Sequence, residues 1–460
     1  MREPSLTMIK AALRRLSSAL STFLHYFKAS KPASMPSAVY QAKMNGSKPA
    51  PVPRTYETLS KTLLFPNLEE KEWWEATGPM LSKMLSDADY DIHHQFHYLN
   101  LWAAHIIPFL GPFPKSRPGL YKCALGGLGS MEFSQNFTKA GATVRLTFEP
   151  TSYAASTGDD LCNRGMVDES LRRLKRISPA VDLTLYHELL CKLTLTDADE
   201  QALVNRDAVA DQAVKTQTMV ALDMKGGDIA AKLYLVPALK SLATGTPMWT
   251  LLRDAVRAVD STVGGIFTQG LANVESYIAN APPSLHADML SCDLVAPTKT
   301  RFKIYVSEFD VNFDRIVDIW TLGGKIQGDE TTHGLAILKG IWDALDIQTG
   351  LRPPPDLNRP SPTLPPDELP IVVNLEIKPG GVWPQPKMYF ALPGQNSLAV
   401  ARAVEGVFRS WGWEEHADSY IRNVQSYKPD VSLEESSNVF SWLSFSYSTK
   451  TGPYVTMYYH

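Results

Sequence analysis

The chain has 460 residues, about three times the ~150 residues of a typical domain, so one large domain or two to three ordinary ones are possible. Apolar residues make up 44% and charged residues 20%, a globular composition that excludes wholesale disorder. The 45 basic and 48 acidic residues nearly cancel, which argues against a dedicated nucleic-acid-binding protein with a basic face. No apolar run reaches the ~18–20 residues that span a bilayer. Four scattered cysteines give neither a disulfide framework nor a zinc pattern, so we expect a cytoplasmic protein with reduced thiols.

Residues 1–53 differ from the rest of the chain. Within residues 1–30, apolar side chains recur every three or four positions and basic side chains predominate, a pattern that predicts a basic amphipathic helix. Such a helix could make weak contact with a membrane surface or act as a transit peptide. The alternative is a loosely attached extension, or an upstream start codon with Met35 or Met44 as the true beginning. A proline-rich linker follows, so we expect an extension over 1–53 and one folded domain over 54–460.

From residue 54 onward, helical stretches alternate with pairs of strands. The clearest pair is 218–224 with 229–236, because two glycines between them supply the positive φ that a tight hairpin needs. Four further pairs are 130–137 with 142–149, 288–296 with 300–307, 371–378 with 386–392, and 439–447 with 454–459. Helical patterns lie between them at 160–176, 250–260, 313–319 and 398–411. This repeat predicts an α/β fold in which ten antiparallel strands close into a barrel with helices outside.

The strands carry the chemistry. Arg301, Lys303 and Tyr305 alternate with apolar residues, so they share one face of their strand. The same step of a cation followed by a tyrosine recurs in Lys232-x-Tyr234 and Lys387-x-Tyr389. The last strand adds Tyr454 and Tyr458, which lie on the same face of that strand. A single half-exposed strand with its polar face in water would look the same. The recurrence favours a shared barrel interior instead.

An interior lined by cations and tyrosines suits a polyanion attached to a group that becomes cationic. The cations would stabilise a leaving diphosphate, and the tyrosine faces would stabilise a carbocation. Geometry alone leaves any phosphorylated metabolite possible. Glu132 lies in an apolar strand with Arg145 on the partner strand, and there it could accept a proton from an N–H or O–H group. The alternative for Glu132 is an ordinary surface glutamate.

Several motifs resemble those of fungal aromatic prenyltransferases of the dimethylallyltryptophan synthase family. They are Tyr90-Asp91 through Gly111-Pro112-Phe113-Pro114, the Glu132 strand, Lys232-x-Tyr234, Leu290-Ser291-Cys292-Asp293 before Arg301-x-Lys303-x-Tyr305, Lys387-x-Tyr389, and the ending Ser444-Phe445-Ser446-Tyr447 with Gly452-Pro453-Tyr454-x-x-x-Tyr458-Tyr459. The resemblance covers roughly residues 56–460. It implies a barrel of repeated α-β-β-α units with ten antiparallel strands, in agreement with the five strand pairs.

The resemblance also implies roles for individual residues. Glu132 matches the base that removes the acceptor's indole proton. The matches to the diphosphate-binding cations are Arg145, Lys232, Arg301, Lys303 and Lys387, and the matches to the tyrosine shield around the allyl cation are Tyr234, Tyr305, Tyr389, Tyr454 and Tyr458. The implied reaction transfers a dimethylallyl group from dimethylallyl diphosphate, as co-substrate, to an electron-rich aromatic carbon, or less often a heteroatom, without a metal or another cofactor. We expect an indole-containing alkaloid or cyclic dipeptide as acceptor and a monomeric or homodimeric enzyme. The alternatives are a phenolic or polyketide acceptor, or a non-catalytic barrel that binds diphosphate.

Three departures from the family pattern bear on the acceptor. Met219 replaces a lysine that acts as acid or base in tryptophan-modifying members, and Asp288 replaces an arginine that holds the amino-acid carboxylate. Trp442 replaces a tyrosine of the shield and keeps a π face without the hydroxyl. Together they predict a larger, uncharged aromatic acceptor in place of free tryptophan.

Two lookalike motifs point to no metal site. His93-His94-Gln95-Phe96-His97 lacks the glutamate of a zinc-protease helix, and Asp87, Asp89 and Asp91 have the wrong spacing for a metal-binding aspartate motif.

Overall fold

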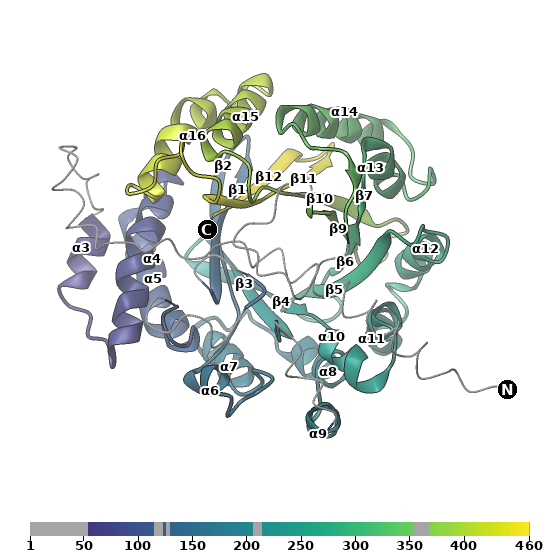
Figure 1. The fold of residues 1–460 in the computed structure, drawn as a ribbon, viewed down its shortest axis with the longest axis horizontal. Helices are drawn as coiled ribbons and strands as arrows, with labels where there is room; N and C mark the ends of the chain where they lie inside the picture. The colour runs from purple at the N-terminus through teal and green to yellow at the C-terminus, as the bar shows by residue number, and fades with distance from the viewer. Residues whose placement is uncertain (1–53, 115–122, 126–128, 206–213, 354–367, 460) are drawn as a thin grey trace.

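Ten strands close into one antiparallel barrel, seen end-on in Figure 1. The computed structural model describes residues 54–114, 123–125, 129–205, 214–353 and 368–459. In chain order the barrel strands are β1 (Met131–Thr138), β2 (Gly141–Phe148), β3 (Thr218–Lys225), β4 (Asp228–Leu235), β5 (Leu285–Asp293), β6 (Phe302–Glu308), β9 (Ile371–Ile377), β10 (Gln385–Ala391), β11 (Phe440–Ser448) and β12 (Gly452–Tyr459). Strand β1 pairs with β12, so the two ends of the sheet meet.

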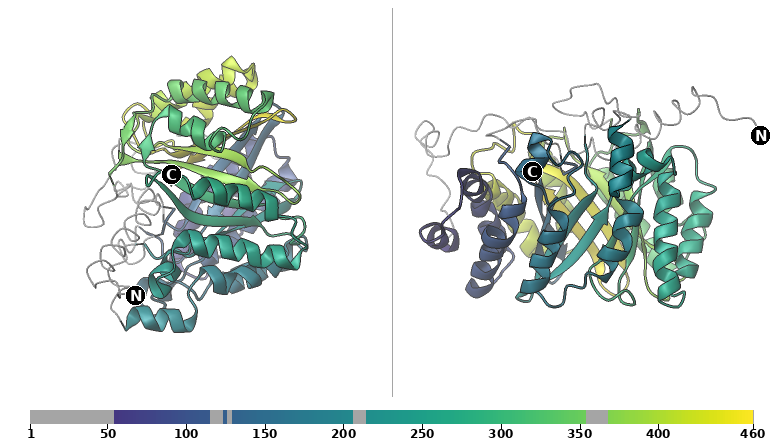
Figure 2. Two further views of the ribbon diagram at one scale, coloured as in Figure 1. Left: turned by 90° about the vertical axis from the view of Figure 1, so that its right-hand side faces the viewer. Right: turned by 90° about the horizontal axis from the view of Figure 1, so that it is seen from below.

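Helices form a ring outside the barrel, and Figure 2 shows them running along its wall. They are α3 (Arg54–Ser60), α4 (Leu68–Asp87), α5 (Ile92–Leu101), α6 (Tyr153–Thr157), α7 (Val167–Ile177), α8 (Thr184–Leu193), α9 (Asp197–Val204), α10 (Ala238–Thr244), α11 (Met248–Thr262), α12 (Thr268–Ile278), α13 (Phe313–Trp320), α14 (Asp329–Ala344), α15 (Ser397–Ser410) and α16 (Glu414–Tyr427). Two short strands, β7 (Asp310–Val311) and β8 (Gly350–Leu351), pair outside the barrel. Within the described ranges, no helix combines the length and apolar character needed to cross a bilayer.

Alternation along each strand separates two environments. In β2, Val144, Leu146 and Phe148 are fully buried and belong to the large apolar core shared with the helices. Arg145 and Thr147 lie between them in the sequence and therefore point to the opposite face. That face is the barrel interior, where the polar and aromatic residues of all ten strands converge.

The structure confirms the predicted barrel and all five strand pairs. The hairpin between β3 and β4 turns at Gly226 and Gly227, whose φ values are +61° and +79°. The helix expected over 160–176 was placed too early, since α7 begins at Val167. Asn163 precedes it with φ +51°, and its side-chain amide donates to the Glu149 carboxylate at 3.0 Å, which is incompatible with a continuous helix there. Residues 1–53 lie outside the described residues, so the predicted extension stays a prediction.

Candidate active site

The strand register places cations opposite carboxylates inside the barrel. The directly opposed pairs are Arg145 with Asp223, Lys232 with Asp293, and Lys303 with Glu376. Opposed residues of an antiparallel pair have their side chains on the same face, so each pair shares the interior. The barrel therefore concentrates charge on one part of its inner wall, and we call the part formed by these three pairs the charged level.

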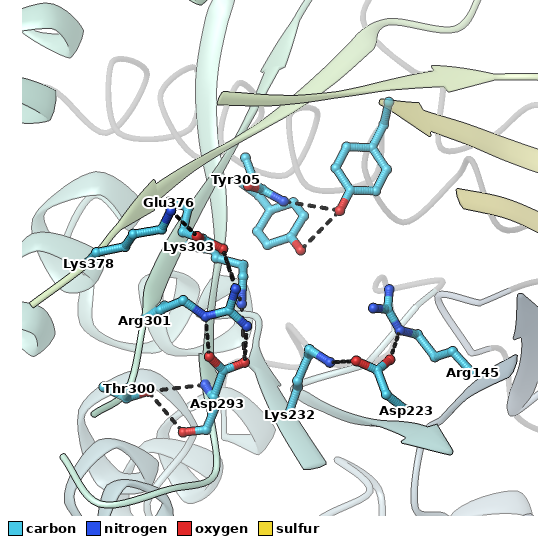
Figure 3. Close-up of polar contacts among 12 residues, drawn as sticks. Arg145, Asp223, Lys232, Asp293, Thr300, Arg301, Lys303, Tyr305, Glu376 and Lys378 are labelled. Atoms are coloured by element: carbon cyan, nitrogen blue, oxygen red, sulfur yellow. Dashed lines mark hydrogen bonds and ion pairs between the residues drawn. The ribbon is translucent and has the colours of Figure 1, made fainter. Parts of the chain in front are cut away.

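Two ion-pair clusters hold four of the five predicted cations, as Figure 3 shows. In the first, Asp223 accepts hydrogen bonds from both Arg145 and Lys232. In the second, Arg301 binds Asp293 in a bidentate manner, with Nε–Oδ2 2.6 Å and Nη2–Oδ1 3.1 Å. Lys303 lies 3.4 Å from the same carboxylate.

Glu376 completes the second cluster. Its carboxylate accepts from Arg301 Nη1 at 3.1 Å and lies 3.9 Å from Lys303 Nζ. Planar bidentate contacts fix the orientation of a guanidinium, so the carboxylates hold the cations in defined positions.

Burial and charge work against each other in the first cluster. Burial alone would raise the pKa of Asp223, but the charges of Arg145 and Lys232 outweigh it and hold that pKa far below its usual value. Burial lowers the pKa of Lys232 to about 8, although the Asp223 charge opposes the shift. The ammonium charge of Lys232 therefore depends on the neighbouring carboxylate.

Lys387 has a different environment from the other four cations. Its Nζ donates to Thr456 Oγ1 at 3.0 Å and lies 5.6 Å from the ring centre of Tyr389 and 4.7 Å from that of Tyr454. Burial, reinforced by the Arg145 charge, lowers the pKa of Lys387 well below its ordinary value. An anion entering the interior would restore the charged form of this lysine.

Four of the five predicted shield tyrosines form a continuous row. The ring-centre distances are 6.0 Å for Tyr234–Tyr305, 5.8 Å for Tyr305–Tyr389 and 6.2 Å for Tyr389–Tyr458. Asn374 donates to the Tyr389 hydroxyl at 3.0 Å, which fixes the middle of the row. The fifth tyrosine, at position 454, lies beside Lys387 instead, nearer the charged level.

An apolar cluster continues from the tyrosine row. Met219, predicted to help select the acceptor, and Trp442, predicted to replace a tyrosine of the shield, belong to it together with Met289 and the ring of Tyr305. Both predicted residues are nearly fully buried. This end of the interior offers a large apolar and aromatic surface.

Glu132 lies in the wall of the interior on β1, opposite Thr147. It is 4% exposed and accepts a hydrogen bond from the Ser441 hydroxyl. Burial raises the pKa of its carboxyl to about 8, and the serine hydroxyl moderates that rise. The structure thus places Glu132 in the interior and not on a surface strand, with a pKa suited to proton transfer near neutral pH.

Several polar atoms of the interior have no hydrogen-bond partner in the described part of the protein. They include Ser134 Oγ, Asn136 Nδ2, Ser291 Oγ and Asp288 Oδ1. Buried polar atoms are normally paired, since leaving one unpaired costs about 1–3 kcal/mol. Their concentration on the inner wall is typical of a site that receives a polar ligand.

The sequence reasoning missed the carboxylates Asp223, Asp293 and Glu376. Their signal was present, because each stands opposite a predicted cation in the paired strands, but the register had to be known to within one residue. In the described ranges, no group of three or more His, Cys, Asp or Glu side chains is arranged to hold a metal ion.

Comparisons with known proteins agree with this geometry. The family model "Tryptophan dimethylallyltransferase" matches residues 69–423. The chain is 43% identical to roquefortine prenyltransferase roqD of Penicillium rubens over 88% of this chain and 94% of that protein. It is 37% identical to prenyltransferase nanD of Aspergillus nanangensis over 88% of this chain and 95% of that protein. The structure of NotF in complex with brevianamide F and DMSPP matches with a TM-score of 0.76 and 32% identity, covering 89% of this chain and 98% of NotF.

Proposed function

Because the chain belongs to the tryptophan dimethylallyltransferase family and is therefore an aromatic prenyltransferase, we propose that its barrel interior catalyses transfer of a dimethylallyl group to an indole. The co-substrate is dimethylallyl diphosphate and the acceptor an indole alkaloid or cyclic dipeptide. The observation that carries the proposal is the stacking of a charged level, a tyrosine row and a buried glutamate within one interior.

The cations hold the diphosphate. Arg145, Lys232, Lys303 and Lys387 occupy paired positions of the barrel strands, and Arg301, just before β6, joins them through Asp293 and Glu376. When the C–O bond of the co-substrate breaks, the electron pair stays on the diphosphate, and fixed positive charges stabilise it without reorganisation. The same charges take the place of a metal ion in our proposal.

The tyrosine row shields the allyl cation. Tyr234, Tyr305, Tyr389 and Tyr458 present ring faces and edges next to the charged level, and cation–π attraction stabilises a carbocation there. Tyr305 and Tyr458 are buried and the other two rings are partly buried, so the row also limits the access of water, which would hydrolyse the cation.

Glu132 accepts the proton. As the indole carbon attacks the allyl cation, the indole N–H becomes acidic, and its proton passes to the Glu132 carboxylate. A non-catalytic diphosphate-binding barrel has no use for such a buried base. This is the feature that favours catalysis over simple binding.

The test is a prenyl-transfer assay with purified protein, dimethylallyl diphosphate and a panel of tryptophan-containing cyclic dipeptides, indole alkaloids, phenols and free tryptophan. We expect products that are heavier by one dimethylallyl group on at least one indole acceptor, detected by mass spectrometry. Products on phenols alone would overturn the indole assignment. Diphosphate binding without any product on the whole panel would favour the non-catalytic barrel.

A further inference from the structure

Asp288 stands at a break in the regular pairing of β5 with β6. Ala287 pairs with Val306 and Met289 with Tyr305, so Asp288 is an extra residue in a β-bulge. Bulges are frequent beside active sites, where they redirect a side chain. The Asp288 side chain is 0% exposed, and its Oδ2 accepts from Ser307 Oγ at 2.6 Å.

The Asp288 carboxyl faces the barrel interior. Ser307 follows Lys303 and Tyr305 at alternate positions of β6, so its hydroxyl points to the same interior. The residue after Asp288, Met289, packs in the apolar cluster with Met219 and Trp442. Asp288 therefore borders the apolar end of the interior, beside strand β6, which carries Tyr305 of the tyrosine row.

One oxygen of this carboxyl lacks a partner. Asp288 Oδ1 is buried and receives no hydrogen bond within the described part of the chain. Burial raises the pKa of Asp288 to about 8, and the hydrogen bond from the Ser307 hydroxyl opposes that rise. Four of the interior cations are already paired with Asp223, Asp293 and Glu376, and the fifth, Lys387, donates to Thr456. A buried carboxyl with a vacant acceptor is best satisfied by a donor that arrives with a ligand.

We propose that Asp288 binds a basic nitrogen of the acceptor, so that the enzyme selects an indole that carries a protonated amine or basic heterocycle, and not the uncharged acceptor expected from the sequence. This inference rests on the proposed function. The proton balance is simple. A neutral base takes the proton of the Asp288 carboxyl on binding, or an already protonated base displaces that proton to solvent. In both cases a carboxylate–cation hydrogen bond forms in a site that water screens poorly.

The test uses three indoles with the same ring and two-carbon chain but different charge. Tryptamine carries an ammonium group, N-acetyltryptamine a neutral amide, and indole-3-propionate a carboxylate. For the wild type we expect kcat/KM to be highest for tryptamine and lowest for the propionate. In Asp288→Asn, the ratio of kcat/KM for tryptamine to kcat/KM for N-acetyltryptamine should fall by roughly 10-fold or more, the usual effect of losing a hydrogen bond to a charged group.

Two controls separate this inference from a folding defect and from the proposed function. The loss for tryptamine in Asp288→Asn is measured relative to 3-methylindole, which lacks any second nitrogen, so that a general fall in activity cancels in the ratio. Direct calorimetry on the wild type should show tighter binding of tryptamine than of N-acetyltryptamine, whether or not the variant folds. Equal binding of the two, or an unchanged tryptamine preference in the variant, would overturn the role of Asp288. Absence of transfer to every indole would instead overturn the proposed function.

Discussion

Glu132 combines a carboxyl group in an almost dry environment with a hydrogen bond from the Ser441 hydroxyl that orients it. We expect Glu132→Gln to lower the rate of prenyl transfer by ~10²-fold or more, the usual scale for a positioned general base. The amide keeps the size and the polar contact, so binding of dimethylallyl diphosphate should change little. Steady-state kinetics with an indole acceptor and calorimetry with the diphosphate measure the two quantities. The matched control is Glu75→Gln, at an exposed residue of a helix. Full activity of the Glu132 variant would show that the proton leaves by another route.

The same carboxyl makes the stability of the fold depend on pH. Its pKa is raised from 4.5 to about 8, so the folded protein holds this proton more tightly than the unfolded chain does. Between those two values the free energy of unfolding contributed by Glu132 falls as the pH rises. Glutamine does not titrate. Relative to wild type, Glu132→Gln should therefore raise the melting temperature at pH 8.5 by roughly 2–5 °C more than it does at pH 5. If the melting temperatures of variant and wild type differed by the same amount at both pH values, the conclusion that burial raises the pKa of Glu132 would be wrong.

At the scale of elements, strands β2, β3 and β4 share one anion. Asp223 on the middle strand binds Arg145 on one side and Lys232 on the other. Burial already lowers the pKa of Lys232 to about 8, and the negative charge of Asp223 opposes this shift. Without the Asp223 charge, the pKa of Lys232 would therefore fall further. The carboxylate therefore keeps a buried lysine charged, and it does so by linking two hairpins.

Asp223→Asn should consequently raise KM for dimethylallyl diphosphate about 10-fold at pH 8, with a smaller change in kcat. Because the lysine regains its proton at lower pH, the defect should shrink markedly at pH 6.5. Kinetics at the two pH values test this pattern. The exposed Asp254 of α11 gives the matched control, Asp254→Asn. A defect that is independent of pH would mean that Asp223 acts through structure alone.

The elements were predictable from the sequence to the extent that local pattern determines them. The glycine hairpin at 225–228 and the alternation of Arg301, Lys303 and Tyr305 are local signals, and both were correct in placement. The partners of these residues were not predictable. The contacts of Arg301 with Glu376, and the bulge at Asp288, depend on how distant strands pair, and a shift of one residue would turn each side chain to the other face.

At the scale of the whole molecule, barrel closure creates a net positive interior in a chain that is slightly acidic overall. At the charged level the cations Arg145, Lys232, Arg301 and Lys303 face the carboxylates Asp223, Asp293 and Glu376, so 4 − 3 leaves one uncompensated positive charge. Lys387 adds a second when an entering anion restores its charged form, and burial keeps the carboxyls of Glu132 and Asp288 largely protonated at neutral pH. The formal charge of the whole chain is −3. The excess exists only because seven strands, β2 to β6, β9 and β10, meet around one interior. The negative charge of a bound diphosphate would compensate this positive excess.

This excess predicts that transfer does not need a divalent cation. A metal ion bound to the diphosphate would reduce its charge and meet the repulsion of the interior cations, whereas the free diphosphate is attracted by them. Turnover should therefore be unchanged, within about twofold, after dialysis against excess EDTA, and added Mg²⁺ should give no stimulation. The informative companion is Lys303→Met, which removes one interior charge. If the protein cations replace the metal, this variant should lose activity without EDTA sensitivity appearing. Complete loss of wild-type turnover on chelation, restored by Mg²⁺, would mean that the metal is required and that the interior cations only assist it.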